Sequence, residues 1–243
     1  MNDKFTYNTE MAQTYETNAR ISIPTYDALF GMVQSYFRAE ISDEDASVLV
    51  IGAGGGKELS TWGPANPEWT FTGVDISEEM LKIAQHKTNQ VGMSHRVNLI
   101  HGTINDLPIA DEAFDAASCI LVLHFIDNVQ EKLELLRSIH AHMKPGAPFV
   151  LVSAYGDRDA PELKDRLNVW RSFWLDAGKP PAVVNEMVNT GIMKISFLPE
   201  KQIEGLLRKS GFTHITKFFV TGLFGGWMCH AGGTDGLDIE CDV

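Results

Sequence analysis

The chain has 243 residues, of which 44% are hydrophobic and 21% are charged, as in ordinary globular proteins. Its formal net charge is −12 and it has no block of five or six basic residues, so we expect no nucleic acid partner. No apolar run reaches the roughly 18 residues of a membrane span. The polar N-terminus lacks the apolar stretch of a signal peptide. We therefore expect a cytoplasmic protein with no membrane partner.

The three cysteines fit neither a disulfide framework nor the spacing of a metal site, and we expect no metal. Residues 1–20 show no clear periodicity. Residues 24–39 carry aromatic and aliphatic side chains at helical spacing and begin with Pro24, which predicts a helix.

From residue 47 on, strands alternate with helices. Strands are predicted at 47–52, 68–75, 96–102, 113–122 and 148–155, and helices at 57–62, 77–90 and 128–143. Ser77 is the expected N-cap of the second of these helices. Short connections between alternating elements indicate a mainly parallel sheet with helices on both faces.

After residue 155 the pattern changes. Helices are predicted at 160–178, 181–191 and 198–211, with no strand between the first two. Two strands, 212–220 and 222–232, follow, with Gly222 in the turn, as expected for an antiparallel hairpin. The glycine-rich acidic tail, residues 232–243, has the composition of a disordered segment.

The stretch Gly52-Ala53-Gly54-Gly55-Gly56 ends the first predicted strand of the alternating region. A dinucleotide fingerprint fails there because its third glycine would be Lys57, and the spacing of a phosphate-binding P-loop fails as well. The remaining G-x-G-x-G pattern lies at the carboxyl end of the sheet, where such folds bind ligands. Glycines at this place let a ligand approach the main chain closely.

Asp75 ends the second predicted strand, 23 residues after Gly52. A carboxylate at that spacing is typical of a residue that accepts hydrogen bonds from the hydroxyls of a ribose. The alternative is a plain helix start, but Ser77 alone would satisfy that alternative.

Six segments resemble, in order, the motifs of class I S-adenosylmethionine-dependent methyltransferases. They are VLVIGAGGGKEL, FTGVDISEEML, LIHGTINDLP, FDAASCILVLHF, MKPGAPFVLVSAY and LLRKSGF. The resemblance implies a three-layer, Rossmann-like α/β fold with a seven-stranded, mainly parallel sheet and an antiparallel last strand. Within the family, the chain is most similar to small-molecule methyltransferases related to carboxy-S-adenosylmethionine synthase. We treat residues 1–243 as one domain, with an N-terminal helical cap (1–40) and a helical substrate cap (160–198).

The resemblance also implies a cofactor, S-adenosyl-L-methionine, and a set of residues that bind it. These residues are Tyr26, Gly52, Ala53, Gly54, Asp75, Ile76, Thr103, Ile104 and Ile120. The expected partner is a small-molecule substrate, and a homodimer is left open. Two alternatives remain: an enzyme similar to carboxy-S-adenosylmethionine synthase, and a cofactor-binding protein without catalysis.

Three positions depart from the pattern of the family. Val50 and Thr103 stand where acids are usual. Leu206 aligns with an arginine that the synthase uses for the extra carboxylate of its product, which favours ordinary S-adenosylmethionine here.

The catalytic residues stay unassigned at this point. His124, Tyr155 and Asp157 are candidates for a base, if the acceptor must lose a proton. Trp170 and Trp174 lie on one helical face with Leu163 and Leu167. This stripe is either the packing face of the cap or, together with Phe173 and Arg171, the wall of an acceptor pocket.

Overall fold

A computed structural model describes residues 9–107 and 114–233, and their side chains from residue 14 on. Within these ranges the core is one sheet of seven strands in the order β3-β2-β1-β4-β5-β7-β6. β7 runs antiparallel to both of its neighbours, and the other pairs are parallel. The predicted mainly parallel sheet with an antiparallel last strand is confirmed. The expected tail lies largely outside the described residues.

The element bounds follow the predicted alternation closely. The strands are β1 (Ser47–Ile51), β2 (Thr70–Asp75), β3 (Val97–His101), β4 (Ala116–Ile120), β5 (Pro148–Ala154), β6 (Phe212–Thr221) and β7 (Phe224–Ala231). The helices are α1 (Thr9–Ser22), α2 (Tyr26–Glu40), α3 (Lys57–Trp62), α4 (Glu78–Gln90), α5 (Val129–Ala141), α6 (Pro161–Asp176), α7 (Pro181–Thr190) and α8 (Glu200–Lys209). Short 3₁₀ turns include η3 (Ile104–Asp106) and η4 (Leu123–Phe125).

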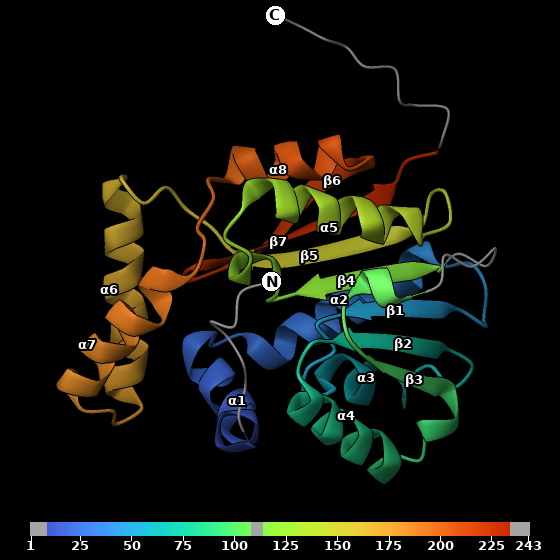
Figure 1. Ribbon diagram of the computed structural model, residues 1–243, viewed down its shortest axis with the longest axis horizontal. Coiled ribbons are helices and arrows are strands. Elements are labelled where there is room, and N and C mark those ends of the chain that lie inside the picture. The colour runs from blue at the N-terminus through green and yellow to red at the C-terminus, as the bar shows by residue number, and fades with distance from the viewer. Residues whose placement is uncertain (1–8, 108–113, 234–243) are drawn as a thin grey trace, which may run out of the picture.

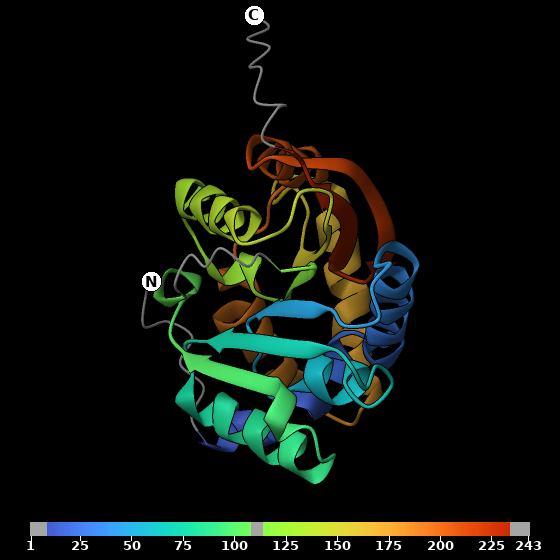
Figure 2. The ribbon, with the colours of Figure 1, turned by 90° about the vertical axis from the view of Figure 1, so that its right-hand side faces the viewer.

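The sheet lies between two layers of helices because its central strands are apolar on both faces. In β1, Val48 and Val50 pack into one hydrophobic cluster, and Leu49 and Ile51 into the other. The first cluster includes α2, α3 and α4, and the second includes α5 and α8. Figure 2 shows the sheet between α5 on one side and α2 on the other. The result is the three-layer arrangement that alternating strands and helices predict.

Helices α1, α6 and α7 lie beyond the carboxyl ends of the parallel strands, as Figure 1 shows. The two predicted helices without an intervening strand are α6 and α7, and they pack on each other. Helix α1 contacts α4 on one side and α6 on the other. These three helices therefore form a cap over the edge of the sheet where ligands of such folds bind.

Gly56 fits the fold at a point that tolerates no side chain. Its φ is +71°, and a Cβ atom there would lie 2.8 Å from the Cα of Ala84 in α4. Gly92 has the same backbone conformation, with φ +72°, and no atom within 4 Å of its added Cβ. The glycine at 56 is thus required for the packing of α3 on α4.

We expect Gly56→Ala to lower the free energy of unfolding by about 1–3 kcal/mol more than Gly92→Ala does. Both variants place alanine in a left-handed conformation, but only the first forces two helices apart. Urea unfolding of the two variants measures the difference. Equal losses would mean that α4 moves aside at no cost.

Candidate functional site

The glycine loop begins where β1 ends and turns the chain over the ends of β1 and β2. The main-chain N–H groups of Gly52 and Ala53 both donate to the carbonyl of Val74, at 2.8 and 3.0 Å. Gly52 has φ +71°, and a Cβ atom there would lie 2.1 Å from Cγ2 of Val122. Only glycine fits this contact. The loop therefore brings bare main chain against the ends of β2 and β4.

Asp75 is the last residue of β2, and its carboxylate is already engaged. Oδ2 accepts a hydrogen bond from the N–H of Gly54, and Oδ1 accepts one from the N–H of Ser77, both at 2.8 Å. Burial raises the pKa of Asp75, and the two main-chain hydrogen bonds oppose that rise. Ser77 is the N-cap of α4, as predicted, because its hydroxyl accepts from Met80 N–H. Asp75 thus links the glycine loop to the start of α4.

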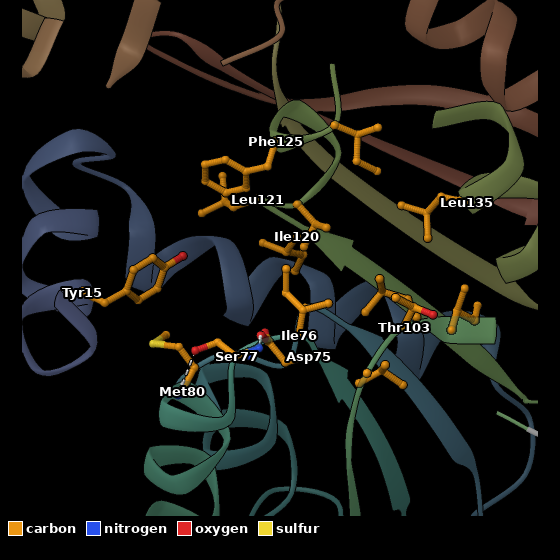
Figure 3. A pocket seen from close by; sticks show the side chains of 18 residues that line it. Tyr15, Asp75, Ile76, Ser77, Met80, Thr103, Ile120, Leu121, Phe125 and Leu135 are labelled. Atoms are coloured by element: carbon orange, nitrogen blue, oxygen red, sulfur yellow. Dashed lines mark hydrogen bonds between the residues drawn. The ribbon is translucent and has the colours of Figure 1, made fainter. Parts of the chain in front are cut away.

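A cavity of about 140 Å³ lies beside this carboxylate (Figure 3). It is bounded by the glycine loop, the ends of β2, β3 and β4, and α1. Ile76, which is 48% exposed, forms one wall. Figure 3 shows Tyr15 entering from α1, with Leu121 and Phe125 on the side of β4. Among the described residues that line it, Asp75 is the one aspartate, glutamate, lysine, arginine or histidine, and most of the others are apolar.

A second, narrow cavity of about 20 Å³ continues from the first, since both are lined by Tyr15, Gly52, Gly54, Ile120 and Leu121. Its volume is near the lower limit for one water molecule, about 10–15 Å³.

Glu58 lines the second cavity and is only 5% exposed. It is in the first turn of α3, and its side chain makes no ion pair with a lysine or arginine of the described residues. Burial is the main cause that raises the pKa of Glu58 to about 8, and the nearby Asp75 adds to it. The carboxyl group is therefore largely protonated at neutral pH.

Charged side chains tie α1 over this second cavity. Glu16 of α1 forms an ion pair with Lys87 of α4. Arg20 bridges Glu16 and Asp27 at 3.0 and 2.8 Å, and Asp27 also pairs with Lys57 at 2.7 Å. This network joins α1 to α2, α3 and α4, and so holds the cap against the glycine loop.

A third and larger cavity, of about 370 Å³, lies under the cap. Its wall comes from α1, η4, α6, α7 and the start of β7. It shares Tyr15, Leu121 and Phe125 with the first cavity. Leu121 lines all three cavities and has φ +62°, a strained conformation for a bulky residue that is common at functional sites. Leu121 therefore stands where the three cavities meet.

The structure brings together all nine residues that the resemblance implied. Each of them lines the first cavity, the second, or both. Sequence reasoning missed Glu58, Tyr15, Met80, Leu121 and Phe125, which share the same walls. An acid two residues after the last glycine of the loop was a usable signal for Glu58, but the other four residues carry no such signal.

Of the three candidate bases, only His124 lies at one of these cavities. Tyr155 lies in the core behind β5, with Arg166 and Lys217 4.2 and 4.0 Å from the centre of its ring, and lines none of the three cavities. Asp157 is exposed and accepts a hydrogen bond from the N–H of Asp159 in a turn. Neither side chain lines one of these three cavities, so the structure does not support either residue as a base there. His124 lines the third cavity.

Other substrate-region hypotheses also need correction. Leu206 is 5% exposed and packs in the core between α8 and α5, so its expected position beside the cofactor is wrong. Arg171 binds the side chain of Asn185 on α7, and neither it nor Phe173 lines the third cavity. Trp170 and Trp174 do line it, and both are also core residues. The stripe is therefore a packing face and a cavity wall at once.

The comparisons with known proteins agree with this geometry. Residues 49–151 match the family model described as a methyltransferase domain. A demethylmenaquinone methyltransferase of Listeria welshimeri is 31% identical over 108 residues, which are 44% of this chain and 42% of that protein. The biotin biosynthesis bifunctional protein BioHC of Teredinibacter turnerae is 29% identical over 165 residues, 66% of this chain and 27% of its own. The matches span less than half of these curated relatives.

Solved structures share the fold over most of the chain. An O-methyltransferase family protein of Burkholderia thailandensis superposes with a TM-score of 0.57 and 15% identity, covering 86% of this chain and 58% of its own. The [4+2]-cyclase SpnF reaches 0.57 with 20% identity, covering 79% and 59%. A cyclase and a methyltransferase family protein thus share one architecture, so the reaction must be argued from the site. In the described ranges, no helix is long and apolar enough to cross a membrane, and no group of three or more histidine, cysteine, aspartate or glutamate side chains is placed to hold a metal.

Proposed function

We propose that this protein transfers a methyl group from S-adenosylmethionine to a small molecule, and that it does so in the cytoplasm. One observation carries the proposal: the cavity beside Asp75 shares Tyr15, Leu121 and Phe125 as lining residues with the third cavity, which lies under the helical cap. A cofactor and an acceptor can thus meet at the carboxyl edge of the sheet. The match of residues 49–151 to a methyltransferase domain supports the same reaction.

The residues of the first two cavities fit the parts of the cofactor. Asp75 would hold the ribose, and the apolar side chains of Ile76 and Ile104 would hold the adenine. The loop at Gly52 and Gly54 would leave room for the methionine portion. This placement uses a mostly apolar wall for the flat base and a carboxylate for the hydroxyl groups.

Glu58 gives the second cavity a carboxyl group that can pair with the amino group of the cofactor. A protonated carboxyl group at the end of a narrow cavity becomes a strong hydrogen-bond acceptor once an ammonium group enters and displaces its proton. We propose that Glu58 takes the role of the acid that is absent at Val50. Val50 itself is fully buried in β1.

When bound, S-adenosylmethionine supplies a methyl group on a positively charged sulfur. The chain itself positions the acceptor beside the methyl donor and excludes water, since the third cavity is lined by the cap and by core side chains.

A carboxylated cofactor is the weaker alternative. An extra carboxylate in a dry site needs a cation beside it. Among the described residues that line the three cavities, Lys57 is the one lysine or arginine, and Asp27 already neutralises it. The alternative of a cofactor-binding protein without catalysis has no comparable support, because it gives the third cavity under the cap no role.

Calorimetry should find micromolar binding of S-adenosylhomocysteine, and much weaker binding of NAD and ATP, because the loop lacks the spacing of either nucleotide motif. A screen of metabolite extracts with isotopically labelled methyl donor would then identify the acceptor. Tight binding of NAD together with no binding of S-adenosylhomocysteine would contradict the proposed function.

We also expect amide exchange of both cap segments to slow when S-adenosylhomocysteine is added. The second cavity holds about one water molecule, so α1 must open to admit a ligand and then close on it. Residues 14–22 and 161–190 should gain protection, and β6, at the far edge of the sheet, should not. Protection confined to residues 48–125 would argue against a lid.

A further inference from the structure

A lysine is buried behind the wall that the first and third cavities share. Lys132 of α5 is only 1% exposed, although lysine is rarely found fully buried. Its Nζ donates a hydrogen bond of 2.6 Å to the carbonyl oxygen of Leu123, in η4. That oxygen also accepts from the N–H of Ile126 at 3.3 Å, so it has a partner in its own turn. The ammonium group is therefore not needed to satisfy an otherwise unpaired carbonyl.

The position of Lys132 is unfavourable for a positive charge. Burial lowers the pKa of Lys132 to about 8, and the charge of Asp127 opposes that shift, so the side chain is still largely charged at neutral pH. Lys132 also lies about one turn from the N-terminus of α5, the end of a helix that disfavours cations. A buried charge costs stability that an apolar side chain of similar size would not cost. Stability alone therefore does not explain this lysine.

The turn that Lys132 holds connects β5 to the cap. The main-chain N–H of Ala154, the last residue of β5, donates a hydrogen bond to Nδ1 of His124 at 3.2 Å. The N–H of Ser196, between the cap and α8, donates to the carbonyl oxygen of His124 at 2.8 Å. One residue of η4 thus binds the sheet through its ring and the returning cap segment through its main chain.

The same turn and the residues just before it form a wall of both cavities. Leu121 and Phe125 line the first and the third cavity. Val122 packs on the main chain of Gly52, where a Cβ atom would lie 2.1 Å from its Cγ2. A shift of η4 would therefore change the cavity beside Asp75 and the cavity under the cap together.

We propose that Lys132 is a positioning residue, whose buried ammonium group holds η4 so that the wall shared by the two cavities stays in the place that methyl transfer requires. The inference rests on the proposed methyltransferase function. Lys132 lines none of the three cavities and acts through the carbonyl of Leu123. A charged donor makes a stronger hydrogen bond than a neutral one, so it holds the turn more firmly than the 3.3 Å bond of Ile126 can. A misplacement of about 1 Å at such a wall can slow a reaction about 100-fold.

Lys132→Met tests this role, because methionine has a similar length but neither a donor nor a charge. We expect its melting temperature to equal or exceed that of the unaltered protein, since a buried charge is removed. Its affinity for S-adenosylhomocysteine should fall by about tenfold, within the range for residues that act on a site without touching the ligand. A methionine variant that binds like the unaltered protein, or that loses affinity only together with stability, would overturn the inference.

Leu136→Met is the matched control. Leu136 is fully buried on the same helix and lines none of the three cavities. Methionine there should lower the melting temperature slightly and leave the affinity for S-adenosylhomocysteine unchanged. The two methionine variants should therefore show opposite patterns of stability and affinity. The same loss of affinity in both would mean that any change in the packing of α5 disturbs the site, and the inference would fail.

Amide exchange of the free protein is a second measurement, and it needs no ligand. The amides of Ala154 and Ser196 both donate to His124, so they should exchange at least about tenfold faster in Lys132→Met than in the unaltered protein, while those of β1 keep their rates. Unchanged exchange at both amides would refute the positioning role. Absence of affinity for S-adenosylhomocysteine in the unaltered protein would refute the proposed function, whereas affinity that Lys132→Met leaves intact would refute only this inference.

Discussion

Replacing Glu58 by glutamine should weaken binding of S-adenosylhomocysteine by at least tenfold, or about 1.5–3 kcal/mol, the range for a hydrogen bond to a charged group. Glutamine has nearly the same shape, so the second cavity keeps its volume while its carboxyl group loses the ability to ionise. Glu68→Gln is the control, because Glu68 is an exposed acid that lines none of the three cavities.

Proton release gives a second measurement of the same interaction. The carboxyl group of Glu58 has a pKa of about 8 in the free protein and should lose its proton when an ammonium group enters. Calorimetry at pH 7 in two buffers of different ionisation enthalpy should show release of up to one proton per ligand. Affinity should rise with pH up to about 8. Binding without proton release, or release that persists in Glu58→Gln, would exclude the role assigned to Glu58.

The same substitution should change the pH dependence of stability. The pKa of Glu58 is raised by folding from an ordinary value of 4.5 to about 8, so the folded protein binds a proton that the unfolded chain has lost. Unfolding free energy of the unaltered protein therefore falls as the pH rises from about 4.5 to about 8. Glu58→Gln removes this loss, and its melting temperature relative to the unaltered protein should rise from pH 5 to pH 8. A constant difference would mean that Glu58 ionises normally.

Much of the fold follows from local sequence patterns. Three features were predicted because each depends on the backbone conformation or hydrogen bonding of one or a few residues. They are the glycine loop, the N-cap at Ser77 and the turn at Gly222. The central strands β1, β4 and β5 were recognisable because they are apolar on both faces. These signals act over a few residues, so they survive without knowledge of the rest of the chain.

The elements that the sequence did not reveal depend on distant contacts. The helix α1 was predicted only as part of a general N-terminal cap, because residues 1–20 show no helical periodicity. Its place is set by ion pairs of Glu16 and Arg20 with α2 and α4, which no local pattern encodes. Leu206 was misplaced for a related reason. Its match to an arginine of the family fixed a position in an alignment, whereas the packing of α8 on α5 turns that position into the core.

The candidate site divides in the same way. Residues on the loop and at strand ends could be named in advance, since the carboxyl edge of a parallel sheet collects them. The residues that line the third cavity, where the acceptor is proposed to bind, could not be named in advance. Whether Trp170 faced the core or a cavity depends on chain segments that meet only in the folded protein.

Asp75→Ala should weaken cofactor binding by about 1.5–3 kcal/mol, because it removes the carboxylate proposed to hold the ribose. The structure adds a second cost. The same carboxylate accepts the N–H groups of Gly54 and Ser77, so its loss leaves two partly buried donors without their partner. We therefore expect a lower melting temperature of the free protein as well as weaker binding.

Asp75→Asn should fall between alanine and aspartate in both measurements. Its single carbonyl oxygen can accept from Gly54 or from Ser77 but not from both, and its amide group turns a donor toward the other. Ser77→Ala is the matched control, since it removes the N-cap hydroxyl bond to Met80 N–H and leaves Asp75 intact. It should cost about 0.5–2 kcal/mol of stability with little loss of affinity. If Asp75→Ala lowers stability but binds S-adenosylhomocysteine as the unaltered protein does, the carboxylate supports the loop and the ribose contact is refuted.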